Sequence, residues 1–137
     1  KNMRVSICRK GHFNAAHRLY NNNWSKEKNK KIFGICSNEN FHGHNYELTV
    51  KIYGELDKET GMVFELKRMK DIIKKEVEDV LDHKNLNLDI PYFKNVVPTT
   101  ENLAIFIWKK LYDAFKIDCK LTVILYETPR NFVEFSG

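Results

Sequence analysis

The segment from residue 42 to residue 54, HGHNYELTVKIYG, constrains the fold most because its residues alternate in polarity. One face carries His42, His44, Tyr46, Leu48, Val50 and Ile52, and the other carries Asn45, Glu47, Thr49 and Lys51. A period of two predicts a β-strand with one face on a core and the other face polar. The two histidines stand where the alternation predicts apolar residues, so they need a reason other than packing.

The other hydrophobic patterns complete an α+β fold in the order ββααββ. Apolar residues recur at helical spacing in residues 65–81 and 99–115, and Thr99 or Thr100 is the expected N-cap of the second helix. The remaining strands are predicted at 4–17, 119–127 and 131–136. We therefore expect one domain over residues 1–137, with a four-stranded antiparallel sheet and both helices on its apolar face. The two open edges of such a sheet favour pairing with another subunit.

Two further segments connect these elements. Residues 21–35 form an insertion, NNNWSKEKNKKIFGI, in which Ser25 is the expected N-cap of a short helix. Residues 82–98, DHKNLNLDIPYFKNVVP, show no regular period and are predicted to be a connecting loop.

Composition and charge narrow the class of protein. No apolar run approaches the roughly 18 residues that a membrane span requires, so no membrane association is expected. The net charge is +5, but the lysines are scattered, which argues against nucleic acid and suits a small polyanionic substrate. The chain has three cysteines, an odd number without dense spacing, which argues against a secreted disulfide scaffold. We therefore expect a reducing, cytoplasmic location. Cys8 and Cys119 are expected to be small buried strand residues.

A third histidine joins the two on the strand. His17 ends the first strand at the parity of Phe13 and Ala15, so antiparallel pairing places it beside His42 and His44. Three imidazoles give Zn²⁺ three ligands and leave a fourth position for water or substrate, as in catalytic zinc sites. With Cys36 as a fourth ligand the site would be closed and structural, and spacing alone leaves both arrangements open.

Several segments, taken in order, carry a family resemblance. They are FNAAHRLY, CSNENFHGHNYELTV, TGMVFELKRMK, LDHKNLNLD, PTTEN and LYET. Together they resemble the 6-pyruvoyl tetrahydropterin synthase family from about His12 to Phe135. The resemblance implies the tunnelling fold, in which three monomers close their sheets into a barrel and two trimers stack into a hexamer. It also implies active sites at subunit interfaces and, as substrate, 7,8-dihydroneopterin triphosphate, which loses triphosphate.

The resemblance also implies roles for particular residues. His17, His42 and His44 stand where the family binds zinc, and Cys36 stands at its catalytic cysteine with the matching spacing C-x5-H-G-H. Zinc can bind the side-chain hydroxyls of the substrate and acidify the adjacent bonds. A thiolate can then act as the base if a nearby cation lowers its pKa.

Further residues match the rest of the family's site. Asp82 and His83 match the pair that completes the proton-transfer triad of the cysteine, contributed in the family by the neighbouring subunit. Glu127 matches the carboxylate that anchors the pterin, where it can accept two parallel N–H bonds from the ring. Further pterin-pocket residues are matched by Thr99, Thr100 and Glu101.

One loop departs from the family pattern. The family loop reads close to CNNPNGHGH, whereas this chain has CSNENFHGH, with Glu39 in place of proline and Phe41 in place of glycine. A subgroup resembling this family uses a loop glutamate as its catalytic group and forms 6-hydroxymethyl-7,8-dihydropterin for folate synthesis. Glu39 is therefore a candidate second base. A zinc-stabilised binding module without turnover is the alternative from another class of protein.

Overall fold

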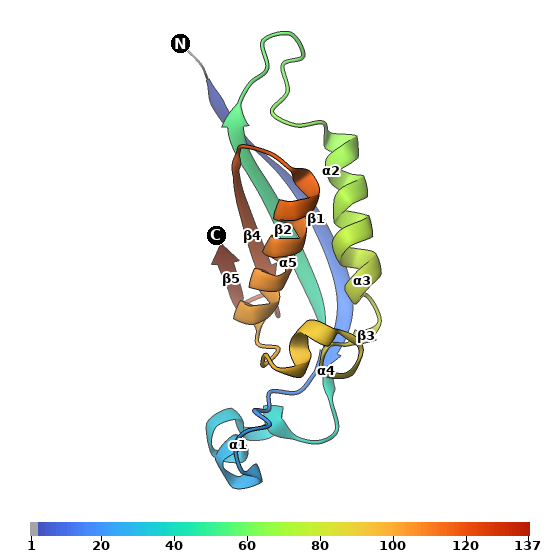
Figure 1. The fold of residues 1–137 in the computed structure, drawn as a ribbon, viewed down its shortest axis with the longest axis vertical. Coiled ribbons are helices and arrows are strands. Elements are labelled where there is room, and N and C mark those ends of the chain that lie inside the picture. Colours follow the sequence, from blue (N-terminus) through green and yellow to red (C-terminus); the bar gives the residue numbers. More distant parts are fainter. Residues whose placement is uncertain (1–2) are drawn as a thin grey trace.

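The structure, a computed structural model, describes residues 3–137 and is organised around one sheet (Figure 1). Its strands are β1 (Arg4–His17), β2 (His42–Glu55), β3 (Lys84–Asn85), β4 (Lys120–Tyr126) and β5 (Phe132–Phe135). They lie in the order β3-β1-β2-β4-β5. The four longer strands are antiparallel neighbours, as the sequence predicted, whereas β3 pairs in parallel with β1.

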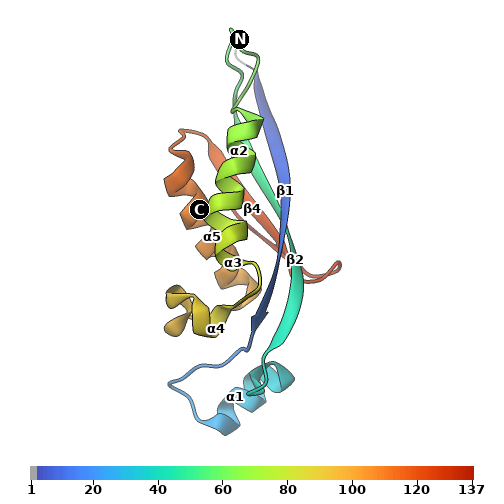
Figure 2. The ribbon, with the colours of Figure 1, turned by 90° about the vertical axis from the view of Figure 1, so that its right-hand side faces the viewer.

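Helices cover one face of this sheet, as Figure 2 shows in side view. One long helix comprises α2 (Leu66–Ile73), the π-helical turn η2 (Lys74–Glu78) and α3 (Asp79–Leu81), and α5 (Thr100–Phe115) lies beside it. The core between helices and sheet includes the buried side chains of Tyr46, Leu48, Val50, Ile52, Met69, Ile73, Leu103 and Ile107. The alternating face of β2 is thus the core face, and the predicted α+β layering is confirmed.

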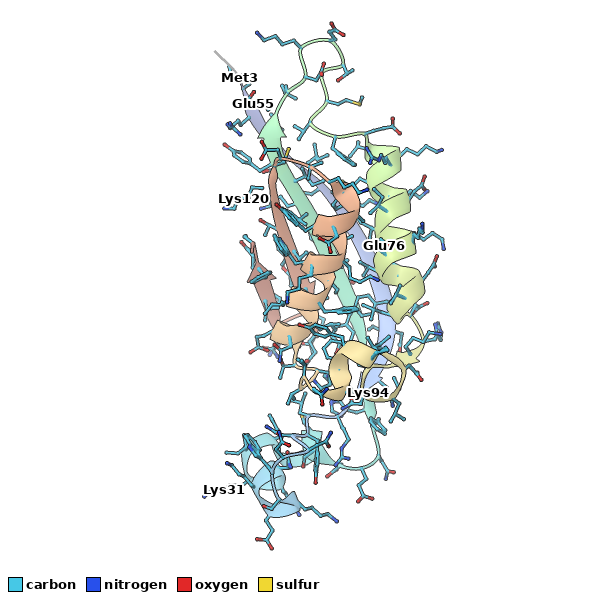
Figure 3. All side chains as sticks on the ribbon, viewed as in Figure 1. Met3, Lys31, Glu55, Glu76, Lys94 and Lys120 are labelled. Carbon is cyan, nitrogen blue, oxygen red and sulfur yellow. The ribbon has the colours of Figure 1, made fainter. Side chains whose placement is uncertain are left out.

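The predicted helix starts are confirmed by hydrogen bonds at their N-caps. The Thr99 hydroxyl accepts the N–H of Asn102 at 3.1 Å, so Thr99 and not Thr100 caps α5. The Ser25 hydroxyl accepts the N–H of Lys28 at 3.1 Å and opens α1 (Lys26–Phe33). With the 3₁₀ turn η1 (Gly34–Ser37), α1 forms a projection at one end of the molecule. Figure 3 labels Lys31 on this projection, far from Met3 and Glu55.

The prediction that residues 82–98 form only an irregular connecting loop is wrong. Part of this segment adds a fifth strand to the predicted four-stranded sheet. The segment contains β3, α4 (Leu86–Asp89) and the 3₁₀ turn η3 (Pro91–Lys94). Its apolar residues Leu86, Ile90 and Phe93 are buried in the core. These elements are too short to show a hydrophobic period, and tertiary packing rather than local propensity stabilises them.

The expectation that both strand cysteines are buried is also wrong. Cys8 is exposed and Cys119 is half-buried. Cys8 lies opposite Lys51 in the β1–β2 pairing, one residue from Ile7, which packs against the core. The period of two places Cys8 on the helix-free face. Within residues 3–137, no helix is long and apolar enough to cross a membrane.

Candidate active site

The three histidines predicted from strand parity meet at one end of the sheet. In the antiparallel pairing of β1 with β2, His17 lies opposite His42 and Ala15 lies opposite His44. The ring centroids are 4.7 Å apart for His17 and His42, and 5.1 Å apart for His44 and each of the others. One nitrogen from each ring lies within 4.8 Å of the others. This spacing suits a single metal ion.

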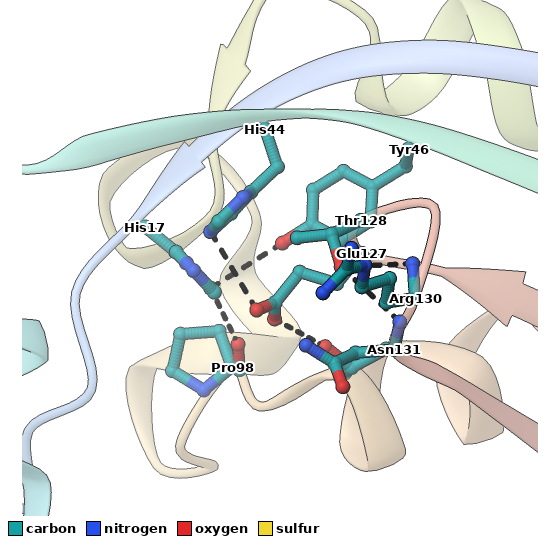
Figure 4. A network of polar contacts seen from close by, with 9 residues as sticks. His17, His44, Tyr46, Pro98, Glu127, Thr128, Arg130 and Asn131 are labelled. Carbon is teal, nitrogen blue, oxygen red and sulfur yellow. Dashed lines mark hydrogen bonds and ion pairs between the residues drawn. The ribbon is translucent and has the colours of Figure 1, made fainter.

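Hydrogen bonding fixes the orientation of the most buried of these rings. His17 is 1% exposed, and its Nδ1 lies 2.8 Å from the carbonyl oxygen of Pro98. A carbonyl only accepts, so Nδ1 carries the proton and Nε2 keeps its lone pair free for a metal. The hydroxyl of the fully buried Tyr46 lies 3.4 Å from the same Nδ1. Figure 4 shows both contacts converging on His17.

The electrostatics of the cluster favour the neutral forms of His17 and His42. Burial lowers the pKa of His17, with His42 and His44 adding like-charge repulsion, although the bond to Pro98 opposes the shift. Burial also lowers the pKa of His42, as does the neighbouring His44. Because only a neutral imidazole can donate a lone pair to a metal, these shifts keep His17 and His42 ready for metal binding near neutral pH.

One buried nitrogen in the cluster lacks a hydrogen-bond partner. Among the described residues, His44 Nε2 is the buried side-chain polar atom without one. An unsatisfied buried polar group is costly, and a metal ion would satisfy it. Cys36 is not in the metal-ligand group within residues 3–137, which comprises His17, His42 and His44. The residues therefore fit a metal with three imidazole ligands and an open position, and not the closed site with Cys36.

Glu127 adjoins the histidines from β4's end. Its Oε1 lies 3.7 Å from His44 Nε2 (Figure 4). Its Oε2 accepts a hydrogen bond from the hydroxyl of buried Thr100. Glu127 is held in turn by the β4–β5 connection, where its N–H donates to the carbonyl of Asn131 at 3.0 Å. The carboxylate is therefore fixed between the histidine cluster and the first turn of α5.

A cavity of about 470 Å³ opens beside this carboxylate. It brings together four residues that the sequence predicted for substrate binding, namely Thr99, Thr100, Glu101 and Glu127. It also includes five that sequence reasoning missed, namely Leu19, Arg130, Asn131, Phe132 and Val133. The last four begin three residues after Glu127, so the turn after the LYET segment was the available signal.

Cys36 lies on η1, separate from the histidine group. Its side chain is half-buried and its thiol is free. Its carbonyl accepts the N–H of Leu19 at 2.7 Å, which holds the turn beside the chain that leaves β1 after His17. The structure thus ties Cys36, through the backbone, to the chain just beyond β1.

Glu39 is on the surface of the projection. Its Oε1 lies 3.8 Å from the ammonium of Lys26, and the two side chains are 78% and 82% exposed. An ion pair so exposed stabilises the protein very little. No ion pair or hydrogen bond within residues 3–137 joins Glu39 to the histidines, so this chain alone does not bring the candidate base to the cluster.

Asp82 and His83 form an exposed pair anchored to the edge of β1. Asp82 Oδ1 accepts the N–H of Asn14 at 2.8 Å, and Asp82 Oδ2 lies 2.9 Å from His83 Nδ1. The Asn14 bond and then His83 lower the pKa of Asp82. His83 has a φ of 59° and its N–H donates to the Asn14 carbonyl at 2.6 Å. His83 thus has a left-handed conformation, which is rare outside glycine, and its imidazole is 84% exposed.

The predicted triad does not form within this chain. Across residues 3–137, neither Asp82 nor His83 has a hydrogen bond or ion pair to Cys36. The contribution of this pair to a neighbouring subunit stays a prediction.

Comparison with known proteins agrees with this geometry. The family model for 6-pyruvoyl tetrahydropterin synthase matches residues 6–137. A 6-pyruvoyl tetrahydrobiopterin synthase from Pongo abelii is 45% identical over 133 residues, covering 97% of this chain and 92% of the relative. The solved structure of 6-pyruvoyl tetrahydropterin synthase from Caenorhabditis elegans superposes with a TM-score of 0.94 at 39% identity, covering 98% of this chain and 96% of that one.

A relative of different name also matches. Dihydroneopterin monophosphate aldolase from Pyrococcus furiosus is 30% identical over 119 residues, covering 87% of this chain and 85% of the relative. The identity is lower than for the synthases, and the match is shorter. By the family model, the long matches to synthases and the shared fold, the chain belongs to the 6-pyruvoyl tetrahydropterin synthase family.

Proposed function

We propose that this protein is a zinc-dependent lyase that acts on 7,8-dihydroneopterin triphosphate and releases triphosphate. Membership of the family, whose long matches are named as synthases, makes it an enzyme of this lyase type. The single observation that supports the site assignment is the meeting of three imidazoles with the Glu127 carboxylate, 3.7 Å from His44 Nε2. Together they form a metal position next to an anion that can orient a ring.

The carboxylate of Glu127 suits the recognition of a pterin. An amino-pyrimidinone ring presents two parallel N–H groups, and a carboxylate can accept both, which fixes the orientation of the ring. Thr100 holds this carboxylate from the first turn of α5, and Thr99 and Glu101 line the same cavity. We infer that the pterin occupies this cavity with its side chain directed towards the histidines.

Zinc is the metal that three neutral imidazoles with an open position suit best. When bound by His17, His42 and His44, it would polarise the hydroxyls of the substrate side chain. The reaction then needs a base that removes a proton from the side chain before triphosphate leaves. Cys36 is our candidate, since a thiolate is competent near neutral pH when a cation lies nearby.

The acid–base partners of Cys36 would come from a second copy of the chain. Asp82 and His83 are exposed and anchored to β1, and within residues 3–137 neither has a hydrogen bond or ion pair to Cys36. The edge strand β5 also lies open, with Phe132 54% exposed. We propose a hexamer, a dimer of trimers whose sheets close into barrels, because this assembly would cover the open edges and supply the missing pair.

Cleavage to 6-hydroxymethyl-7,8-dihydropterin, with Glu39 as base, is the second candidate. The match to the relative from Pyrococcus furiosus favours it, because that protein is named an aldolase, and an aldolase cleaves a carbon–carbon bond. Deprotonating a hydroxyl of the side chain permits retro-aldol cleavage, whereas deprotonating carbon leads towards triphosphate elimination. The exposed position of Glu39 in this chain favours the synthase reaction.

Product analysis tests the proposal. The zinc-loaded protein is incubated with 7,8-dihydroneopterin triphosphate, and the pterin products of the wild type, Cys36→Ala and Glu39→Ala are separated by chromatography. We expect the pyruvoyl product and triphosphate from the wild type, strong loss with Cys36→Ala, and little change with Glu39→Ala. The hydroxymethyl product as the main species, lost with Glu39→Ala, would reverse the assignment. A protein that unfolds on chelation and never turns over the substrate would instead be a binding module.

A further inference from the structure

We propose that Arg18 is a positioning residue that fixes the turn carrying Cys36 against the end of the metal-binding strand. The inference rests on the proposed function, because it concerns where the candidate base is held. Arg18 directly follows His17, the most buried member of the histidine cluster, and Cys36 lies on η1. One side chain thus connects the two parts of the site that must keep a constant separation.

The guanidinium of Arg18 forms two hydrogen bonds to the end of η1. Its Nη2 and Nε donate to the carbonyl oxygen of Ser37 at 2.6 and 3.2 Å. Ser37 is buried and is the last residue of the turn, where carbonyls lack partners within the helix. The guanidinium carbon also lies 3.9 Å from the centroid of the Tyr20 ring. A planar cation that stacks and donates in pairs is held in one orientation, which lysine cannot reproduce.

Arg18 is itself anchored by its backbone. Its N–H donates to Asn87 Oδ1 at 2.9 Å, and its carbonyl accepts from Asn87 Nδ2 at 3.0 Å. The side chain of Asn87, on α4, therefore continues the parallel pairing that β3 makes with the preceding residues of β1. The backbone of Arg18 is therefore held in place, so its side chain can hold η1 in a constant position.

The rest of η1 offers few other restraints. Within residues 3–137, the hydrogen bonds that join η1 to the continuation of β1 are those of Arg18 to Ser37 and of Leu19 to Cys36. The turn begins at Gly34, with a φ of 59°, and the side chain of Ile35 is 82% exposed. Without the guanidinium, Leu19 alone would hold the turn to the metal-binding strand, and Cys36 would shift relative to His17.

The test compares Arg18→Lys with the wild type in the zinc-loaded protein. Steady-state kinetics give kcat and KM, and mass spectrometry follows iodoacetamide alkylation of Cys36, with the exposed Cys8 as internal reference. Arg68→Lys is the matched control. Arg68 lies on α2, and its guanidinium carbon also lies over an aromatic ring, 5.2 Å from the centroid of the Phe64 ring. Tyr20→Leu removes the stacking partner and leaves the hydrogen-bonding groups intact.

We expect Arg18→Lys to lower kcat about a hundredfold, as a misplaced catalytic group does, with zinc content unchanged. KM should change less than about threefold. Alkylation of Cys36 relative to Cys8 should change at least about threefold, because the surroundings of the thiol change. Tyr20→Leu should act in the same direction but less strongly, and Arg68→Lys should match the wild type.

Two results would overturn the inference. One is an unchanged alkylation ratio in Arg18→Lys, and the other is a loss of kcat explained by lost zinc or a lower melting temperature. Failure of the proposed function looks different. A wild-type protein that never turns over the triphosphate substrate would refute that function, yet the alkylation ratio would still report whether Arg18 holds Cys36.

Discussion

The adjacent threonines Thr99 and Thr100 separate helix stability from ligand binding. Thr99 caps α5 through Asn102, whereas the buried Thr100 donates to Glu127 in the proposed pterin site. Replacing an N-cap threonine by alanine costs about 1 kcal/mol. For a chain of 137 residues, an unfolding entropy of about 2.1 cal/mol/K per residue converts this into a melting temperature lower by about 3 °C. We expect Thr99→Ala to show that shift, with a smaller loss of ligand affinity than Thr100→Val.

Thr100→Val should weaken ligand binding in addition to lowering stability. Valine keeps the shape of threonine but removes a hydrogen bond to a charged group, which is worth about 1.5–3 kcal/mol. The side chain of Glu127 is 29% exposed, so water can replace part of this bond and the lower value applies. A loss of about 1.4 kcal/mol is tenfold in the dissociation constant.

Calorimetric titration of the zinc-loaded protein with 7,8-dihydroneopterin, alongside thermal unfolding of each variant, measures both effects. We expect binding about tenfold weaker in Thr100→Val and a smaller change in Thr99→Ala, whose hydroxyl is engaged by the N–H of Asn102. Equal affinity in Thr100→Val and the wild type would refute the reasoning, because Glu127 would then not depend on this hydroxyl to receive the ligand. An unshifted melting temperature in Thr99→Ala would likewise refute the assigned cap.

Three further predictions concern the metal cluster and the sheet. His44→Ala should abolish stoichiometric zinc binding, measured by atomic absorption after dialysis, while circular dichroism stays native; retained zinc would contradict the three-histidine site. In the metal-free protein, the lowered pKa values of His17 and His42 mean that the unfolded chain binds more protons below about pH 6.5, so the melting temperature should fall with falling pH. His17→Leu should flatten this dependence, and an unaltered slope would speak against it. Gly54→Ala should destabilise the protein by about 1–3 kcal/mol in urea unfolding, because a Cβ would lie 2.7 Å from the Cys119 sulfur; an unchanged midpoint would show that the sulfur moves aside.

Local patterns were enough to predict the parts of the fold that repeat with a regular period. The alternation of residues 42–54 matches β2, and the helical spacing of residues 65–81 matches the long helix from α2 to α3. Such periods report which face of an element meets the core. The segment 82–98 has no period, and its short elements exist because Leu86, Ile90 and Phe93 find a core that distant residues build.

The site divides in the same way. By itself, the sequence determined the histidine cluster, because the parity of a strand fixes which side chains share a face once two strands pair. Only the tertiary structure decided that Glu127 and Thr100 adjoin the cluster. The same holds for the hydrogen bonds from Arg18 to Ser37 on the turn that carries Cys36. Those contacts join segments that lie far apart in the sequence, and no repeating pattern relates their positions. Their geometry therefore depends on the packing of the whole domain and not on any local pattern.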